Sequence, residues 1–177
     1  MLVRRIMKPE EAHRPKRIPN PQVLNDAEQY FRAYRILEAS HDVLLPTLQT
    51  GAIALELYLK CLGAEDIHIA EGEPSIPDLQ RVHANAAHSH ELVKLLQEIP
   101  ADTRTRLRDA FEANPLSQHE GSFEKRLGQL EGLFFDSRYP FEEGRRVDRY
   151  PPSLLQGLLR FLHEFAFSEI KRQTSDY

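Results

Sequence analysis

Arg138 is the residue of this sequence best placed to hold an anion. It follows the apolar stretch Leu133-Phe134-Phe135 and precedes Tyr139-Pro140. Proline restricts the residue before it to extended geometry, so the chain direction after Arg138 is fixed. A guanidinium is planar, permanently charged and matched to phosphate or carboxylate oxygens. Two roles stay open for Arg138: phosphate binding beside Tyr139, or an internal ion pair with an acid such as Glu56, Glu91 or Asp136.

Glu56 and Lys60 are polar residues of an otherwise apolar helix. They lie four residues apart with the glutamate first, which is the better order for an ion pair along a helix. Since the rest of residues 52–62 is apolar or small, this polar line must face solvent, a polar pocket or a partner. The sequence leaves open whether the line is a solvated stripe or the wall of a groove.

His90 lies in Ser89-His90-Glu91-Leu92, which has the residue types of a helix start. The dipole of that helix disfavours a charged imidazole, so we expect a neutral ring that hydrogen-bonds. The free backbone N–H groups of the same helix end can receive an anion. The predicted ligand site therefore comprises Arg138, Tyr139, His90, Lys60 and Glu56.

The sequence offers little support for metal, cofactor or classical catalytic chemistry. His83, His88 and His90 lie near Glu91, but their spacing matches no known metal motif, so we expect neither a metal nor a cofactor. The chain has no glycine-rich phosphate loop and no Gly-x-Ser-x-Gly motif. Cys61, the only cysteine, lies in an apolar helix where a reactive thiolate is not expected. Hydrolase, kinase and dehydrogenase interpretations are not supported.

Composition and charge indicate one helical domain with a basic N-terminal tail. The 177 residues suffice for a core, and no apolar run approaches the roughly 20 residues of a membrane span. With no signal peptide and one cysteine, we expect a cytoplasmic protein without disulfides. Residues 1–20 carry six Lys or Arg and two Glu, a charge of +4, so the remainder carries −8. The tail either binds nucleic acid or is a solvated end.

The periodicity of apolar residues predicts an up-and-down helical bundle of five to six helices. A proline-containing tail over 1–24 and a short tail over 173–177 flank a single domain over 25–172. Asn25 and Glu28 have the spacing of a capping box, so the first helix is expected to begin at Asn25. A long connection over 64–89 has no convincing strand, although Ile67-His68-Ile69 is a weak candidate. The predicted helices span about 25–40, 46–62, 89–99, 102–113, 122–135 and 153 onward, with 46–62 central.

The order of three short segments makes the chain resemble a HEPN domain, a small helical domain named for higher eukaryotes and prokaryotes nucleotide-binding. After a helix rich in Tyr and Phe come Ala54-Leu55-Glu56-Leu57-Tyr58-Leu59-Lys60, then Ser89-His90-Glu91-Leu92, then Arg138-Tyr139-Pro140. The resemblance covers residues 25–172 and implies a helical bundle that commonly forms homodimers. Many members are toxins or defence ribonucleases that need no metal, and others are non-catalytic partners of nucleotidyltransferases.

The ribonuclease members carry Arg-x(4–6)-His on a late helix. There the arginine positions phosphate, and the histidine acts on the ribose hydroxyl or the leaving oxygen. In this chain Arg35 and His41 have the spacing but end the first predicted helix, and Arg81 and His88 have it within a connection. Arg138 has no histidine at that distance downstream. This departure weakens the ribonuclease interpretation.

Two functions from different classes therefore follow from the resemblance. The first is a non-catalytic module that binds a nucleotide, RNA or a protein partner, such as a nucleotidyltransferase or antitoxin, in a toxin–antitoxin or defence system. The second is a metal-independent ribonuclease toxin. We also expect a homodimer, because large apolar residues exceed what one buried face of each helix needs, among them Tyr34, Phe161 and Phe167.

Overall fold

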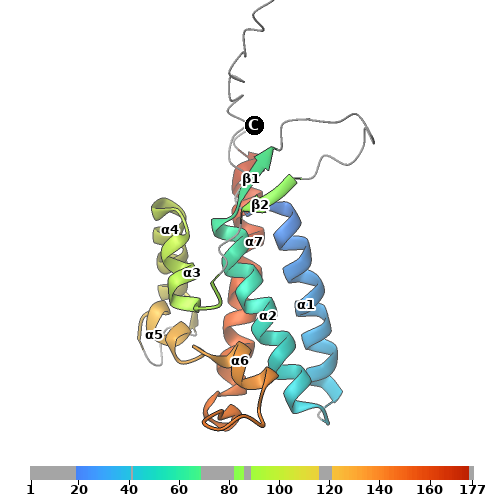
Figure 1. Ribbon diagram of the computed structural model, residues 1–177. Helices are drawn as coiled ribbons and strands as arrows, with labels where there is room; N and C mark the ends of the chain where they lie inside the picture. The colour runs from blue at the N-terminus through green and yellow to red at the C-terminus, as the bar shows by residue number, and fades with distance from the viewer. Residues whose placement is uncertain (1–18, 41, 69–81, 86–88, 116–120, 176–177) are drawn as a thin grey trace, which may run out of the picture.

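The computed structural model describes residues 19–40, 42–68, 82–85, 89–115 and 121–175. Most of the predicted basic tail, His41, and most of the connection after the second helix lie outside these residues. The described part is the predicted all-helical bundle, with one short pair of strands attached to its end (Figure 1). The strands do not supply the core, which the helices form.

The first helix, α1 (Pro21–Ser40), begins earlier than predicted. Asn20 is its cap, because the Asn20 side-chain oxygen accepts hydrogen bonds from the N–H groups of Gln22 and Val23. Pro21 occupies the first helical position, where its missing N–H costs nothing. The predicted capping box is therefore wrong: Asn25 lies within the helix, and Glu28 contacts other helices instead.

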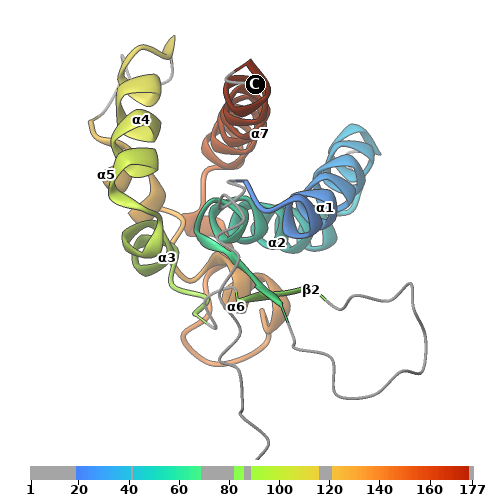
Figure 2. The same cartoon turned by 90° about the horizontal axis from the view of Figure 1, so that it is seen from above.

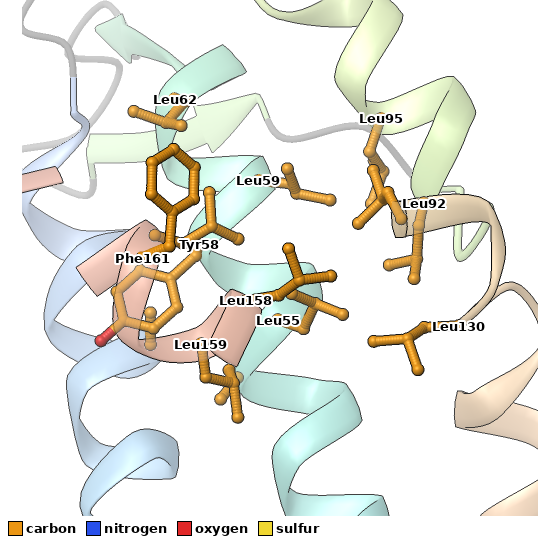
Figure 3. Packing of buried hydrophobic residues seen from close by; sticks show 14 of the residues in the cluster. Leu55, Tyr58, Leu59, Leu62, Leu92, Leu95, Leu130, Leu158, Leu159 and Phe161 are labelled. Atoms are coloured by element: carbon orange, nitrogen blue, oxygen red, sulfur yellow. The ribbon is translucent and has the colours of Figure 1, made fainter. Parts of the chain in front are cut away.

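Helix α2 (Leu44–Gly63) is central, as predicted. Figure 2 shows α1, α6, α7 and the group of α3, α4 and α5 arranged around it. The side chains of Leu55 and Leu59 are fully buried. Figure 3 shows the leucines of α2 between those of α7 and those of α3. The near-complete apolar circumference of this helix is explained by neighbours on almost every side.

Helix α7 (Pro152–Ser175) packs against both α1 and α2. It runs in the direction of α2 and opposite to α1 (Figure 1). The three helices approach closely at Gly51, where a Cβ atom would lie 2.8 Å from Leu155 Cδ2 and 2.9 Å from Tyr34 Cδ2. The absence of a side chain at Gly51 is thus part of the packing.

The short helices α3 (Leu92–Glu98), α4 (Ala101–Glu112) and α5 (Phe123–Gly128) form a group beside α2 and α7. Helix α4 is fastened to α7 by Arg106, whose Nε and Nη2 atoms lie 3.0 and 2.7 Å from the carboxylate of Glu169. Glu169 is buried, and Arg172 also lies 3.1 Å from it. The burial of this carboxylate is therefore compensated by two cations.

The single helix predicted over 122–135 is two helices, α5 and α6 (Leu133–Arg138). Gly132 separates them with a φ of +85°, a conformation that glycine adopts without strain. Leu127, Leu130 and Leu133 are all buried, so turns between the helices preserve the inward spacing that suggested one helix. The break brings the described helices to seven and lays α6 against α2.

Two further elements are short. Strands β1 (Glu65–His68) and β2 (Val82–Asn85) pair antiparallel, with Ile67 opposite His83. Residues 67–68 of the weak strand candidate are therefore in a strand. A 3-10 helix, η2 (Val147–Arg149), precedes α7. Among the described residues, no helix is long and apolar enough to cross a membrane.

Most of the apolar residues on which the homodimer prediction was based are packed inside the single chain. Tyr34 and Phe161 are buried, so counting them as surplus apolar surface was wrong. Phe167 remains 39% exposed. Other large apolar residues are exposed on either side of the turn between α1 and α2, namely Ile36 near the end of α1, and Leu44 and Leu45 at the start of α2. The surface available to a partner differs from the predicted one.

Candidate functional site

Glu56 is the centre of the candidate site. Its side chain lies on α2 and is almost completely buried, with 6% of the residue exposed. One carboxylate oxygen lies 2.6 Å from Lys60 Nζ, and the other lies 2.9 Å from His90 Nδ1. Because both oxygens have a donor, the buried charge is compensated. The ammonium of Lys60 is correspondingly committed to Glu56, so Lys60 positions the carboxylate.

His90 lies just before α3 and is held on several sides. Its ring stacks on Phe134 at 4.6 Å with an angle of 5° between planes, and meets Phe135 edge-on at 5.4 Å. Since a carboxylate only accepts hydrogen bonds, Glu56 favours a proton on Nδ1 of His90. The side chain is 40% exposed. His90 is therefore an oriented imidazole at the surface.

Arg138 joins this group through the aromatic rings. Its guanidinium carbon lies 5.9 Å from the ring centre of Phe134 and 5.5 Å from that of Tyr139, within cation–π range. Arg138 is exposed, and within the described part of the chain it has no ion pair or hydrogen bond from its guanidinium. Phe134 thus contacts both His90 and Arg138, so the predicted site residues come together in space.

The internal ion pair that was open for Arg138 is not formed with the buried acids nearby. Glu56 is occupied by Lys60 and His90. Asp136 lies two residues before Arg138 but faces the other way, toward Arg145 and Arg149 at 3.1 and 3.0 Å. Arg138 is left available to a ligand.

The backbone N–H groups at the start of α3 are not free, contrary to the prediction. The two carboxylate oxygens of Glu131 lie 3.0 and 3.2 Å from the N atoms of Leu92 and Val93. Glu131 thus takes the place predicted for a bound anion. Sequence reasoning missed it because Glu131 is remote in the chain and in the turn between α5 and α6.

A buried cluster around Asp136 fixes the segment after α6, and sequence reasoning did not find it. Tyr150 Oη donates to Asp136 at 2.8 Å, and Arg145 Nη1 donates at 3.1 Å. Burial opposes the charged carboxylate, but the hydrogen bonds from Tyr150 and Arg145, with the charge of Arg149, hold the pKa of Asp136 below its ordinary value. Burial raises the pKa of Tyr150 to about 12, the hydrogen bond to Asp136 adding to the effect while Arg149 opposes it.

One sequence signal relates to this cluster. The tripeptide Arg-Tyr-Pro occurs at 138–140 and again at 149–151. The second tyrosine, Tyr150, donates to the aspartate that precedes the first copy. The two copies therefore have different environments, since Tyr150 is buried and Tyr139 is half-buried against Arg138.

A second polar cluster lies between α1, α2 and α7. Tyr58 Oη donates to Glu28 Oε1 at 2.5 Å, and His163 Nδ1 lies 2.7 Å from the same oxygen. Phe31 and Phe167 lie against the imidazole of His163, at 5.2 and 4.8 Å between ring centres. Burial and the hydrogen bond to Glu28 raise the pKa of Tyr58. The cluster satisfies polar groups at the edge of the core and connects the three long helices.

Within the part of the chain that the structure describes, the site lies at the surface beside a small hollow. A hollow beneath His90 and Phe134 has a volume of about 10 Å³, which is too small for a nucleotide. No group of three or more His, Cys, Asp or Glu side chains among the described residues is placed to hold a metal ion. The histidine candidates His83 and His88 lie outside the described side chains. Burial raises the pKa of the Cys61 thiol, which makes a reactive thiolate unfavourable.

The arrangement can hold an anionic or planar group at the surface. Arg138 supplies a permanent charge, His90 supplies a ring nitrogen directed away from Glu56, and the rings of Phe134 and Tyr139 keep the guanidinium in place. Comparison of the chain with models of protein families, with curated proteins and with solved structures gives no match.

Proposed function

We propose that this protein is a non-catalytic, HEPN-like helical module that binds a phosphate-bearing ligand, RNA or a nucleotide, at the surface around Arg138. The observation that carries the proposal is the state of Arg138. It is exposed, held over two aromatic rings, and has no ion pair within the described residues. An arginine in that state is available to donate two hydrogen bonds to phosphate oxygens in a bidentate contact.

The neighbouring groups support a binding role. Lys60 pairs with Glu56 and balances its charge, so Glu56 does not repel a phosphate strongly. Phe134 connects His90 to Arg138, which makes the two functional groups part of one surface. The resemblance to HEPN domains supports the same interpretation, since Glu56, Lys60, His90 and Arg138 all lie in the segments that carry it.

The test is the substitution Arg138→Ala, compared with Arg35→Ala as a control. Arg35 is an exposed arginine on α1, so the change in net charge is the same. Fluorescence anisotropy with a labelled single-stranded RNA measures binding, and circular dichroism measures the Tm. We expect Arg138→Ala to weaken binding with the Tm unchanged, and Arg35→Ala to bind as the parent does. Equal weakening in both variants, or no binding by the parent protein, would overturn the proposal.

A metal-independent ribonuclease is the second candidate, and one observation favours it. Glu56 orients His90 at 2.9 Å, as a carboxylate orients the imidazole of a general base. Cleavage of RNA in the presence of EDTA, abolished in His90→Ala, would establish this candidate in place of a non-catalytic module. Intact RNA after prolonged incubation with the parent protein would exclude His90 from such a role under those conditions.

We further propose that the chain forms a homodimer and acts in the cytoplasm, in a toxin–antitoxin or defence system with a nucleotidyltransferase or antitoxin partner. The resemblance supports this setting. The exposed apolar residues at the turn between α1 and α2 support self-association. A gene for such a partner beside the gene for this chain, and its co-purification with the protein, are the expected findings.

A further inference from the structure

Aromatic side chains near Arg138 are exposed instead of being packed into the core. Phe141 is 83% exposed and Phe135 is 38% exposed, and both lie in or just after α6. Exposed phenylalanines gain nothing from water, so a group of them beside a free cation indicates a surface that a ligand covers. Together with Phe134, Arg138 and Tyr139, they form what we call the stacking surface.

The planar groups of the stacking surface follow one another without interruption. His90 stacks on Phe134, and Arg138 lies over the rings of both Phe134 and Tyr139. Tyr139 then meets Phe141 edge-on, with 6.4 Å between ring centres. These contacts join the planar side chains into one continuous group.

The charged side chains around the stacking surface leave a place for a phosphate backbone beside the rings. Arg138 provides the cation without an ion pair among the described residues. Arg145 lies 6.0 Å from the ring centre of Phe135 and pairs with Asp136 and Glu142, while Arg149 also pairs with Asp136. Exposed carboxylates remain at Glu143 and Glu91, so binding depends on stacking as well as on charge.

These features together select the ligand. We propose that the stacking surface binds single-stranded nucleic acid, with unpaired bases against the rings of Phe135, Tyr139 and Phe141 and a phosphate on Arg138. Every base has a π-face, and stacking on aromatic side chains is the main way in which proteins bind single strands without sequence preference. In a duplex those faces are covered by neighbouring base pairs. The inference rests on the proposed function and specifies its ligand.

The test uses Phe141→Ala, because an 83% exposed side chain can be removed without disturbing the core. Tyr30→Ala is the control, since Tyr30 is an exposed aromatic residue that lies on α1. The probes are labelled oligoadenylate as RNA, the corresponding DNA, the RNA duplex with oligouridylate, and adenosine monophosphate. Anisotropy measures the oligonucleotides, and calorimetry measures the mononucleotide.

We expect single-stranded RNA and DNA to bind. The duplex should bind at least about tenfold more weakly than the single strands. Phe141→Ala should weaken single-strand binding by about five- to tenfold, and Tyr30→Ala should leave it unchanged. A preference of single-stranded RNA over DNA would assign the 2′-hydroxyl a part in recognition without changing the surface.

The outcomes separate the two proposals. If Phe141→Ala binds as the parent does, or if the duplex binds as tightly as the single strand, the stacking surface is overturned. If Arg138→Ala nevertheless loses adenosine monophosphate, the phosphate site of the proposed function stands alone. If Arg138→Ala binds every probe as the parent does, the proposed function itself fails.

Discussion

Asp136 is the residue on which the segment after α6 most depends. It is buried and accepts hydrogen bonds from Tyr150 and Arg145. Asp136→Asn should lower the free energy of unfolding by about 2 kcal/mol, because Arg145 and Arg149 lose a charged partner and one acceptor becomes a donor.

Urea denaturation followed by circular dichroism measures this change. Asp148→Asn is the matched control, because Asp148 pairs with Arg146 at the surface and both side chains are exposed. We expect it to change the free energy of unfolding by less than about 0.5 kcal/mol. Equal effects of the two substitutions would show that the Asp136 cluster does not stabilise the fold.

Tyr150 gives the chain a pH dependence on the alkaline side. Its pKa is about 12 in the folded chain, against an ordinary value of 10.0, so the folded chain resists ionisation. The corresponding stabilisation is complete below about pH 10 and is lost as the pH rises toward 12. Tyr150→Phe should therefore lose less stability over this interval than the parent, measured by urea denaturation at each pH. Tyr139→Phe, at the surface, serves as control and should follow the parent; the reverse ranking would contradict the assignment.

At the residue scale, the structure brings together residues that the sequence predicted as one site. Glu56 contacts Lys60 and His90, and Phe134 contacts His90 and Arg138. Ligand binding by these residues stays a prediction. Glu131 was missed because a side chain that caps a helix from another part of the fold leaves no local pattern. The sequence could not decide whether Arg138 forms an internal ion pair. The answer depends on the direction of the Asp136 side chain, which faces Arg145 and Arg149.

At the scale of elements, Gly132 determines where α6 points. Its φ of +85° is unfavourable for other residues, and a Cβ atom there would lie 3.0 Å from Arg149 Nη2 and from Tyr150 Oη. Gly132→Ala should lower the free energy of unfolding by about 1–2 kcal/mol from backbone strain, with a further loss from that contact.

Gly144→Ala is a matched control for Gly132→Ala in thermal and urea denaturation. Gly144 has nearly the same φ, +83°, but nothing lies within 4 Å of its Cβ position. It should therefore show the backbone strain alone, and the difference between the two variants reports the contact with Arg149 and Tyr150. A smaller effect at Gly132 than at Gly144 would contradict this account of the break.

The helices were predicted best where their apolar pattern was strongest. A central helix was predicted over residues 46–62 because most of its circumference is apolar. The central position of this helix, α2, is confirmed. The break between α5 and α6 was missed because Leu127, Leu130 and Leu133 keep facing inward through the turn. The start of α1 was misplaced because Asn25 and Asn20 both have a suitable side chain, and only the geometry at Asn20 decides between them.

At the scale of the whole molecule, the apolar surface at the turn between α1 and α2 is the best candidate for a homodimer contact. Ile36 and Leu45 are exposed, at 72% and 37%, and Leu44 lines a shallow groove of about 190 Å³ together with Leu37 and Val43. A twofold axis through such a surface pairs each patch with its own copy and covers both. The stacking surface on α6 is formed by other residues.

We therefore expect the parent protein to have the mass of a dimer by multi-angle light scattering at micromolar concentration. Ile36→Glu should give the monomer mass, because two buried carboxylates would face each other across the axis. Phe141→Glu is the control, since it adds the same charge to the stacking surface and should leave the dimer intact while weakening binding of single-stranded RNA. A monomeric parent protein would refute the homodimer. A dimer that persists in Ile36→Glu but dissociates in Phe141→Glu would move the contact to α6 and make the stacking surface part of the interface.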